Sequence, residues 1–334
     1  MKNRGGIKMC AVFECKSKKV YPIIYPIRYG QMNNINCYLY EHQNKLTLID
    51  AGIDAAEYQF FFEEQLAIYG LNITDIDQII LTHHHVDHIG MVNKIIEKKQ
   101  IPVFAHPLAI ERLALTPAYQ KTKIQFFQEL YERYGCAEVM ASRIEKMQQT
   151  LHNNSGLRIQ TVIEPIQAND YIGDLKVLET PGHSLDSISL YDEECGWLFT
   201  GDFMIERGTT NALIDFDSKR LLLPTVLQQR QSIEQCQKYS VSTVFAGHEA
   251  IFDYFAEVAQ LNIEKIDYKV QRIVKQIDQG NETVLELANA LYGDLLHKIP
   301  TLILSEVIGY VYFAEILGSV ERVQRDGLLT FRSI

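Results

Sequence analysis

The sequence predicts an α/β fold in which sheets are covered by helices. Short apolar segments of strand length alternate along most of the chain with longer segments whose apolar residues recur at helical spacing. The composition, 47% hydrophobic and 22% charged residues, is that of an ordinary globular protein and excludes wholesale disorder. At 334 residues, we expect one large domain and one small domain.

The N-terminal third begins with a polar leader and continues as a predicted sheet with helices. Residues 1–19 carry scattered lysines but no apolar core of the length found in signal peptides. From residue 20 onward the sequence predicts a catalytic domain that extends to residue 261. Its first strands are predicted over residues 21–29, 36–41, 46–50, 79–81 and 102–105, and helices over 54–69 and 88–98.

Residues 107–151 are predicted to be helical throughout and to form an insertion in the catalytic domain. Apolar side chains recur there at spacings of three and four, at Ile124, Phe127, Leu130, Tyr131 and Tyr134. Such a stripe either packs in the core or caps the active site, and its position between the two halves of the catalytic domain leaves both interpretations open.

The second half of the catalytic domain repeats the alternation of strands and helices. Strands are predicted over residues 157–164, 175–179, 189–191, 196–200 and 241–246, and a helix over 225–239. The endings Leu48-Ile49-Asp50-Ala51-Gly52 and Leu198-Phe199-Thr200-Gly201-Asp202 are similar, which hints at a duplicated half-domain.

Residues 262–334 change character and predict a small separate domain. Helices are expected over 263–277, 284–292 and 301–317, followed by a hairpin over 320–331. This order resembles a winged-helix domain. From residue 261 onward the chain has eight basic and ten acidic side chains, whereas a module that binds DNA is normally basic. We therefore expect packing against the catalytic domain, or a dimer contact.

The segment most informative about function is His83-His84-His85-Val86-Asp87-His88, between a buried strand and a helix. Side chains two apart in an extended segment share one face, so His83 and His85 can bind one metal ion while His84 points away. Asp87 and His88 follow at the turn into the helix and can face a second ion. A fortuitous cluster of surface histidines would not lie between two buried elements.

The pattern His-x-His-x-Asp-His resembles the signature of the metallo-β-lactamase superfamily, and three later motifs resemble its remaining signatures in the expected order. They are Pro181-Gly182-His183-Ser184, Thr200-Gly201-Asp202 and Ala246-Gly247-His248. The resemblance implies a four-layer αβ/βα sandwich over about residues 20–260. It also implies that the first ion is bound by His83, His85 and His183, the second by Asp87, His88 and His248, and that Asp202 bridges them.

This ligand set implies a binuclear metal-dependent hydrolase, in which a hydroxide bridging two divalent ions attacks the substrate. Asp87 is expected to act in catalysis by orienting that hydroxide. Zinc is the expected metal, although iron or manganese also suits such ligands. The expected substrate is a small thioester or ester, and no glutathione-binding signature supports a strict glyoxalase II. A nuclease or phosphodiesterase, and a non-catalytic metal-binding regulatory module, are the alternatives.

The remaining features concern nearby polar residues, thiols and partners. Asp50 is expected either to support the ligands or to cap a strand, His84 to turn behind its loop, and His106 to be packed rather than to border the pocket. The six cysteines are widely spread, so we expect reduced thiols in a cytoplasmic protein; a metal site at Cys10 and Cys15 is disfavoured. The net charge of −10 disfavours a nucleic-acid partner. No apolar run reaches about 18 residues, so we expect no membrane span. A homodimer is a further expectation.

Overall fold

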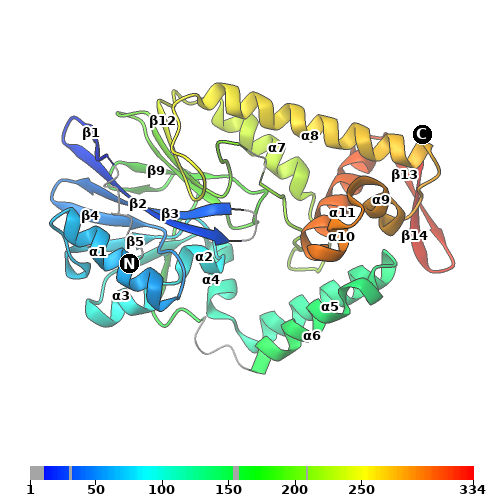
Figure 1. Ribbon diagram of the computed structural model, residues 1–334, viewed down its shortest axis with the longest axis horizontal. Helices are drawn as coiled ribbons and strands as arrows, with labels where there is room; N and C mark the ends of the chain where they lie inside the picture. The colour runs from blue at the N-terminus through cyan, green and yellow to red at the C-terminus, as the bar shows by residue number, and fades with distance from the viewer. Residues whose placement is uncertain (1–10, 30–31, 153–157, 208–209) are drawn as a thin grey trace, which may run out of the picture.

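The protein is built from two facing sheets with helices on both outer sides and a helical C-terminal part that ends in a hairpin (Figure 1). The computed structural model describes residues 11–29, 32–152, 158–207 and 210–334. The predicted four-layer αβ/βα sandwich is confirmed.

The first sheet contains seven strands whose spatial order follows the chain. The strands are β1 (Phe13–Cys15), β2 (Lys18–Tyr29), β3 (Met32–His42), β4 (Lys45–Ile49), β5 (Gln78–Ile80), β6 (Val103–Ala105) and β7 (Ile163–Pro165). β1 to β4 pair antiparallel, whereas β4 to β7 pair parallel. Parallel neighbours need long crossovers, and these contain α1 (Ala56–Ile68), η1 (Ile73–Asp75), α2 (Val86–Ile89), α3 (Val92–Lys98) and α4 (Pro107–Ala114).

The second sheet contains five strands in the order β12-β11-β10-β9-β8. Their bounds are β8 (Tyr171–Ile172), β9 (Leu175–Glu179), β10 (Ile188–Asp192), β11 (Trp197–Gly201) and β12 (Thr243–Ala246). β11 and β12 pair parallel and are joined through α7 (Thr225–Cys236), and the other strands pair antiparallel.

Alternation of side chains along the strands creates the layers. Leu48 packs against the helices outside the first sheet, while its neighbour Ile49 faces the second sheet. Leu198 and Phe199 divide in the same way between the outer helices and the space between the sheets. The ring of Phe199 lies there with its centroid 4.7 Å from that of Phe245. Both faces of each sheet are therefore buried, which explains the continuous apolar runs in the sequence.

The remaining helices form the insertion and the C-terminal part. α5 (Pro117–Arg133) and α6 (Ala137–His152) form an antiparallel pair at one side of the molecule (Figure 1). The chain ends with α8 (Phe255–Asp278), α9 (Val284–Tyr292), α10 (Leu295–Lys298), α11 (Pro300–Ile316), β13 (Val320–Arg325) and β14 (Leu328–Ser333). Three helices and the hairpin predicted here are confirmed, and the likeness to a winged helix stays a prediction. The predicted boundary between residues 261 and 262 falls inside α8.

α11 carries mostly apolar side chains and is enclosed by its neighbours. Residues 303–311 are all buried, as expected for a helix in the centre of a packed unit. Despite this apolar character, no helix among the described residues combines the length and hydropathy needed to cross a membrane.

Several predicted elements differ from the structure: residues 107–151 form three helices with breaks at 115–116 and 134–136, and two further elements differ for reasons that the contacts show. Residues 158–162 form no strand, because Asn93 satisfies their backbone: its side chain bonds the carbonyl of Arg158 and the amide of Gln160 at 2.8 and 2.9 Å. The helix expected from His88 begins at Val86 and is interrupted at Gly90. There the chain packs so closely that a Cβ would lie 2.0 Å from the carbonyl carbon of Ile53.

The expectation of reduced thiols is wrong for one pair, because Cys15 and Cys195 form a disulfide across 180 residues. The turn between β1 and β2 lies beside the turn between β10 and β11, a proximity that no spacing in the sequence reveals. β1 itself lies within the predicted leader. The described cysteines that remain free, Cys37, Cys136 and Cys236, are buried. Cys10 lies outside the described residues, and the cytoplasmic location stays a prediction.

A buried lysine links the two sheets next to this disulfide. Lys18 is 1% exposed, and its Nζ lies 2.9 Å from Asp192 Oδ2 and 2.9 Å from Asp174 Oδ2. Asp192 is fully buried and also accepts a hydrogen bond from the Tyr40 hydroxyl at 2.8 Å. Because both charges are buried, they have lost their hydration, and each is stabilised by the other.

We expect Lys18→Met to lower the free energy of unfolding by about 3 kcal/mol, because the buried Asp192 carboxylate would keep its charge without its cation. Urea denaturation at neutral pH measures the effect. Lys19→Met is the matched control: the Lys19 ammonium lies 3.5 Å from Glu14 with both side chains about half exposed, so its loss should cost no more than about 0.5 kcal/mol. Equal effects of the two variants would contradict a stabilising role for the buried pair.

Candidate metal centre

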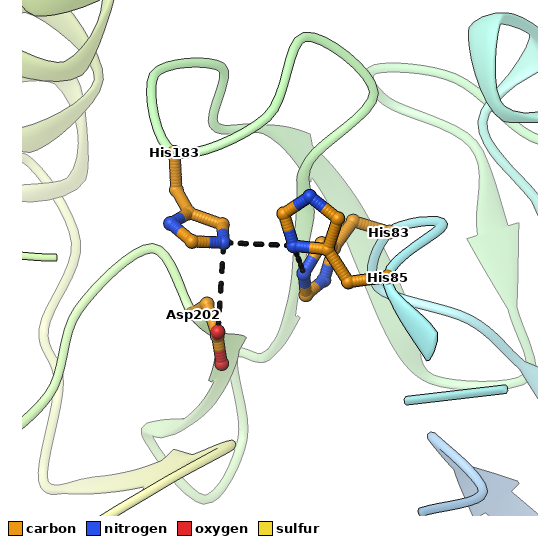
Figure 2. A group of neighbouring side chains, drawn as sticks. All are labelled: His83, His85, His183 and Asp202. Carbon is orange, nitrogen blue, oxygen red and sulfur yellow. Dashed lines mark hydrogen bonds and ion pairs between the residues drawn. The ribbon is translucent and has the colours of Figure 1, made fainter. Parts of the chain in front are cut away.

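The first group of predicted ligands converges on one point. His83 and His85 lie in the loop after β5, and His83 Nε2 is 2.9 Å from His85 Nδ1. His183 follows β9, and its Nε2 lies 3.0 Å from the same Nδ1 (Figure 2). Asp202 completes the group from the end of β11, with Oδ2 3.5 Å from His183 Nε2. These four ligand atoms all lie within 4.8 Å of one another.

The second group shares Asp202 with the first. His88 Nε2 lies 3.1 Å and His248 Nε2 3.3 Å from Asp202 Oδ1. Asp87 Oδ2 is 3.4 Å from His248 Nε2, and the four ligand atoms again lie within 4.8 Å of one another. Apart from these ion-pair contacts, His88 Nε2 and Asp202 Oδ1 are buried and make no hydrogen bond with the described residues. The structure thus brings all seven predicted ligands together, and Asp202 directs one oxygen to each group.

The ligands are held at one edge of the sandwich because they follow strand ends. β5, β9, β11 and β12 lead into the loops that carry His83, His183, Asp202 and His248. β12 continues into Gly247, where a Cβ would lie 2.7 Å from Asp202 Oδ1 and 2.7 Å from His88 Cε1. Only glycine leaves room for both ligands at this position.

We expect Gly247→Ala to weaken metal binding by roughly 10–100-fold, because the new methyl group would displace Asp202 and His88 from their shared point. Competition with a chelator measures the affinity. Gly70→Ala is the control: nothing lies within 4 Å of the Cβ position at Gly70, and its φ of +73° strains the backbone without touching a ligand, so it should keep wild-type metal affinity even if it lowers stability. Unchanged affinity in Gly247→Ala would show that Asp202 and His88 can bind the metal without a glycine at position 247.

Four of the five ligand histidines are fixed through their second ring nitrogen, which sets the tautomer. His183 Nδ1 donates to the carbonyl of Asn211 at 3.0 Å, and His248 Nδ1 donates to the carbonyl of Asn34 at 2.7 Å. In each case the nitrogen that faces the centre is the one left to accept a metal ion.

Asp50 fixes the other two histidines, and both roles proposed for it are confirmed. Its Oδ2 accepts from His88 Nδ1 at 2.7 Å, which supports a ligand directly. It also holds the histidine loop, because Oδ1 accepts from the backbone N–H of Thr82 and Oδ2 from its hydroxyl, both at 2.8 Å. The Thr82 hydroxyl in turn lies 3.1 Å from His83 Nδ1.

The two groups differ in their electrostatics. Burial lowers the pKa of His83, His85 and His183, so these imidazoles are neutral and their lone pairs are free for a cation. Burial also opposes a charge on His88 and His248, but Asp202 and the other nearby carboxylates outweigh it; they raise the pKa of His88 well above its ordinary value and that of His248 to about 10. The second group therefore binds protons where a divalent cation would otherwise balance the carboxylates.

The remaining histidines near the loop lie outside both groups of ligands. His84 turns away from the ligand atoms, with Nδ1 2.8 Å from Asp186 Oδ1, as predicted, and it also lines the cavity described next. His106 caps α4: its Nδ1 accepts from the backbone N–H of Leu108 at 3.2 Å. It is 8% exposed and does not line the cavity described next, in agreement with the prediction that it is packed.

A cavity of about 160 Å³ opens on the first group of ligands. His85 and His183 form its inner end. α5 and α6 form one wall, and the first turns of α11 form another through Thr301, Leu302 and Ser305. Phe127, from the predicted stripe, lines this cavity and also belongs to the buried core. The insertion therefore both packs in the core and covers the centre.

Comparison with known proteins agrees with this geometry. The model of the Metallo-beta-lactamase superfamily matches residues 31–248. The chain belongs to this superfamily. It is 27% identical over 296 residues to the "Probable metallo-hydrolase YqjP" of Bacillus subtilis (strain 168), covering 86% of this chain and 90% of that protein. A "Hydroxyacylglutathione hydrolase" of Psychromonas ingrahamii is 24% identical over 244 residues, covering 71% and 70%.

Solved structures show that the superfamily fold extends over nearly the whole chain. A metallo-beta-lactamase family protein from Thermus thermophilus, TTHA1429, superposes with a TM-score of 0.76 at 21% identity, covering 94% of this chain and 98% of that one. Superfamily members generally bind divalent metal ions. The predicted family, fold and enzyme class, a hydrolase, are confirmed.

The residues that sequence reasoning missed lie in the cavity wall, outside the superfamily motifs. Arg112, Tyr119, Lys123 and Arg143 come from α4, α5 and α6, and Asp215 from the loop after β11. A weak signal existed: Lys123 precedes Phe127 by four residues, so both lie on the same face of α5. Nothing in the sequence indicates that this face turns toward the histidines.

Proposed function

We propose that this chain is a binuclear metal-dependent hydrolase that cleaves a small ester or thioester. The observation that carries the proposal is the division of the Asp202 carboxylate. One of its oxygens belongs to a group with three imidazoles, and the other belongs to a group with two imidazoles and Asp87. A single carboxylate between two such groups is suited to join two cations.

The donor set fits two divalent cations, with zinc as the expected metal. Three neutral imidazole nitrogens face one another in the first group, and in the second both His88 Nε2 and His248 Nε2 lie within 3.3 Å of Asp202 Oδ1. When bound, such ions lower the pKa of water toward 7 and polarise a carbonyl oxygen. Mixed imidazole and carboxylate ligands also suit iron and manganese.

The side chains around the metal centre would orient the attacking water and position the substrate. Asp87 is 7% exposed, and its proposed role is to accept a hydrogen bond from the attacking water and so fix its direction. His85 and His183 end the cavity, so a substrate that fills it presents its reacting carbon to the first group. Phe127, Ile214 and Leu302 give the cavity an apolar surface against which an acyl chain can pack.

A small acyl substrate is favoured over a polynucleotide. The cavity of about 160 Å³ accommodates a short chain, and its basic residues are gathered in one place. Two relatives named "Hydroxyacylglutathione hydrolase", from Psychromonas ingrahamii and Legionella pneumophila, each match over at least 70% of their length. That name describes removal of an acyl group from glutathione, which is thioester cleavage.

The test is a substrate panel with the zinc-, iron- and manganese-loaded protein. It consists of a lactoyl thioester of glutathione, para-nitrophenyl pentanoate, a homoserine lactone and bis-para-nitrophenyl phosphate. We expect two metal ions per chain and a kcat/KM for the thioester or the ester at least about tenfold above that for the phosphodiester, a difference of about 1.4 kcal/mol in barrier. Preference for the phosphodiester would favour the nuclease alternative. Full metal loading without any hydrolysis would favour the regulatory module.

A further inference from the structure

The cavity beside the metal centre is basic, although the chain as a whole has a net charge of −10. Arg112, Lys123 and Arg143 line it, and Asp215 is the acidic residue among the lining side chains. Arg112 is held in place, because its Nη2 lies 2.8 Å from both carboxylate oxygens of Asp215 and its Nη1 donates to the Leu108 carbonyl at 2.9 Å. That ion pair neutralises one of the three cations.

The two other cations have no acidic partner. Neither Lys123 nor Arg143 makes a salt bridge or hydrogen bond within the described part of the chain, and both are half-buried. They contact aromatic faces instead. The Arg143 guanidinium lies 4.4 Å from the ring centroid of Phe127, and Lys123 Nζ lies 6.0 Å from that of Tyr119. Such contacts orient a cation but do not neutralise it.

The surroundings disfavour these charges while the cavity holds no anion. Burial lowers the pKa of Lys123, and the nearby charges of Arg143 and Arg112 add to this effect although Asp215 opposes it. Burial also lowers the pKa of Arg143. A negatively charged group in the cavity would reverse both effects, because an opposite charge favours the ionised form of a buried base.

We propose that Lys123 and Arg143 form an anion subsite that binds a carboxylate or phosphate at the far end of the substrate from its scissile bond. The inference rests on the proposed hydrolase function, since it places the reacting carbonyl group at His85 and His183 and the anionic tail between α5 and α6. Arginine can bind such a group through two parallel hydrogen bonds, and lysine through its point charge. The substrate class is thus an anionic acyl ester or thioester.

The kinetic test compares substrates that differ only in the tail. The mono-para-nitrophenyl ester of glutaric acid carries a carboxylate, the corresponding ester of phosphonobutyric acid carries a phosphonate, and para-nitrophenyl pentanoate is neutral. We expect the wild-type KM for an anionic ester to lie at least about tenfold below that for the pentanoate, as two charge-assisted hydrogen bonds would produce. Whichever anionic ester has the lower KM identifies the charged group.

The variants assign this preference to the two residues. Lys123→Gln and Arg143→Gln should each remove most of the preference by raising KM for the anionic esters, whereas Lys123→Arg and Arg143→Lys should retain part of it. Lys121→Gln and Lys146→Gln are matched controls, because they remove one charge from exposed positions of the same helices. A KM ratio that is the same in wild type and in both glutamine variants would overturn the subsite. So would charge-retaining variants as impaired as the neutral ones.

A binding measurement separates this proposal from the proposed hydrolase activity. Calorimetric titration of the zinc-loaded protein with glutarate and with inorganic phosphate should give a Kd at least about tenfold weaker in the Lys123→Gln, Arg143→Gln double variant. Lys121→Gln should bind like the wild type. If no ester is cleaved but this difference is found, the hydrolase proposal fails and the anion subsite stands. If esters are cleaved but the double variant binds both anions like the wild type, the subsite is overturned.

Discussion

Asp202→Ala is expected to lower kcat/KM on the best substrate of the panel by roughly a thousandfold, equivalent to about 4 kcal/mol of barrier. The carboxylate belongs to both groups of ligands, so its loss removes one donor from each and the connection between them. Metal content should fall from two ions per chain to at most one, which elemental analysis after desalting measures. Activity and metal content should decline together.

The matched control for this variant is Asp253→Ala, which removes an exposed carboxylate from the loop between β12 and α8. It should change neither metal content nor kcat/KM by more than about twofold, since an exposed charge outside the centre contributes little. Retention of two metal ions and wild-type activity by Asp202→Ala would remove the basis of the proposed function.

Removal of the metal ions should lower the free energy of unfolding by about 4 kcal/mol for each ion when the free metal concentration before chelation is a thousandfold above its Kd. The cause is that the seven buried ligands come together only in the folded chain, so the ions bind the folded state and not the unfolded one. Denaturation in urea with and without a chelator gives the difference.

Asp202→Ala separates site-specific stabilisation from weak binding elsewhere. This variant should respond to the chelator much less than the wild type, because it lacks a shared ligand. Lys121→Gln changes a residue outside the centre, so the chelator should lower its free energy of unfolding by as much as it lowers that of the wild type. An equal loss in Asp202→Ala would mean that the stabilising ions are bound at another place.

Local sequence patterns predicted the ligands because each ligand is specified by its own short segment. His83 and His85 are brought together by the extended backbone after β5, and His183, Asp202 and His248 each follow a strand end. The hint of duplication also has a structural counterpart. Asp50 comes directly after β4 and Asp202 directly after β11, although the two are offset by two residues in the similar endings, and they contact the two ring nitrogens of His88.

Features that depend on long-range packing could not be predicted. The disulfide between Cys15 and Cys195 needs two turns from different sheets to meet, and the ion pair of Lys18 with Asp192 needs the same approach. The cavity wall combines the consecutive helices α5 and α6 with α11, which is distant from them in sequence and meets them only in the folded chain (Figure 1). Apolar spacing predicts that a helix has a buried face but does not reveal which surface covers it.

The first turns of α11 have a consequence for how this protein can change. Thr301, Leu302 and Ser305 border the substrate cavity, while the rest of the same helix is enclosed in the C-terminal part. A mutation in α11 can therefore change both the substrate selectivity of the cavity and the packing of the C-terminal part. Trimming the chain to a minimal catalytic unit would open one side of the binding chamber, and laboratory evolution toward new substrates should find its productive mutations in α11 as readily as around the histidines.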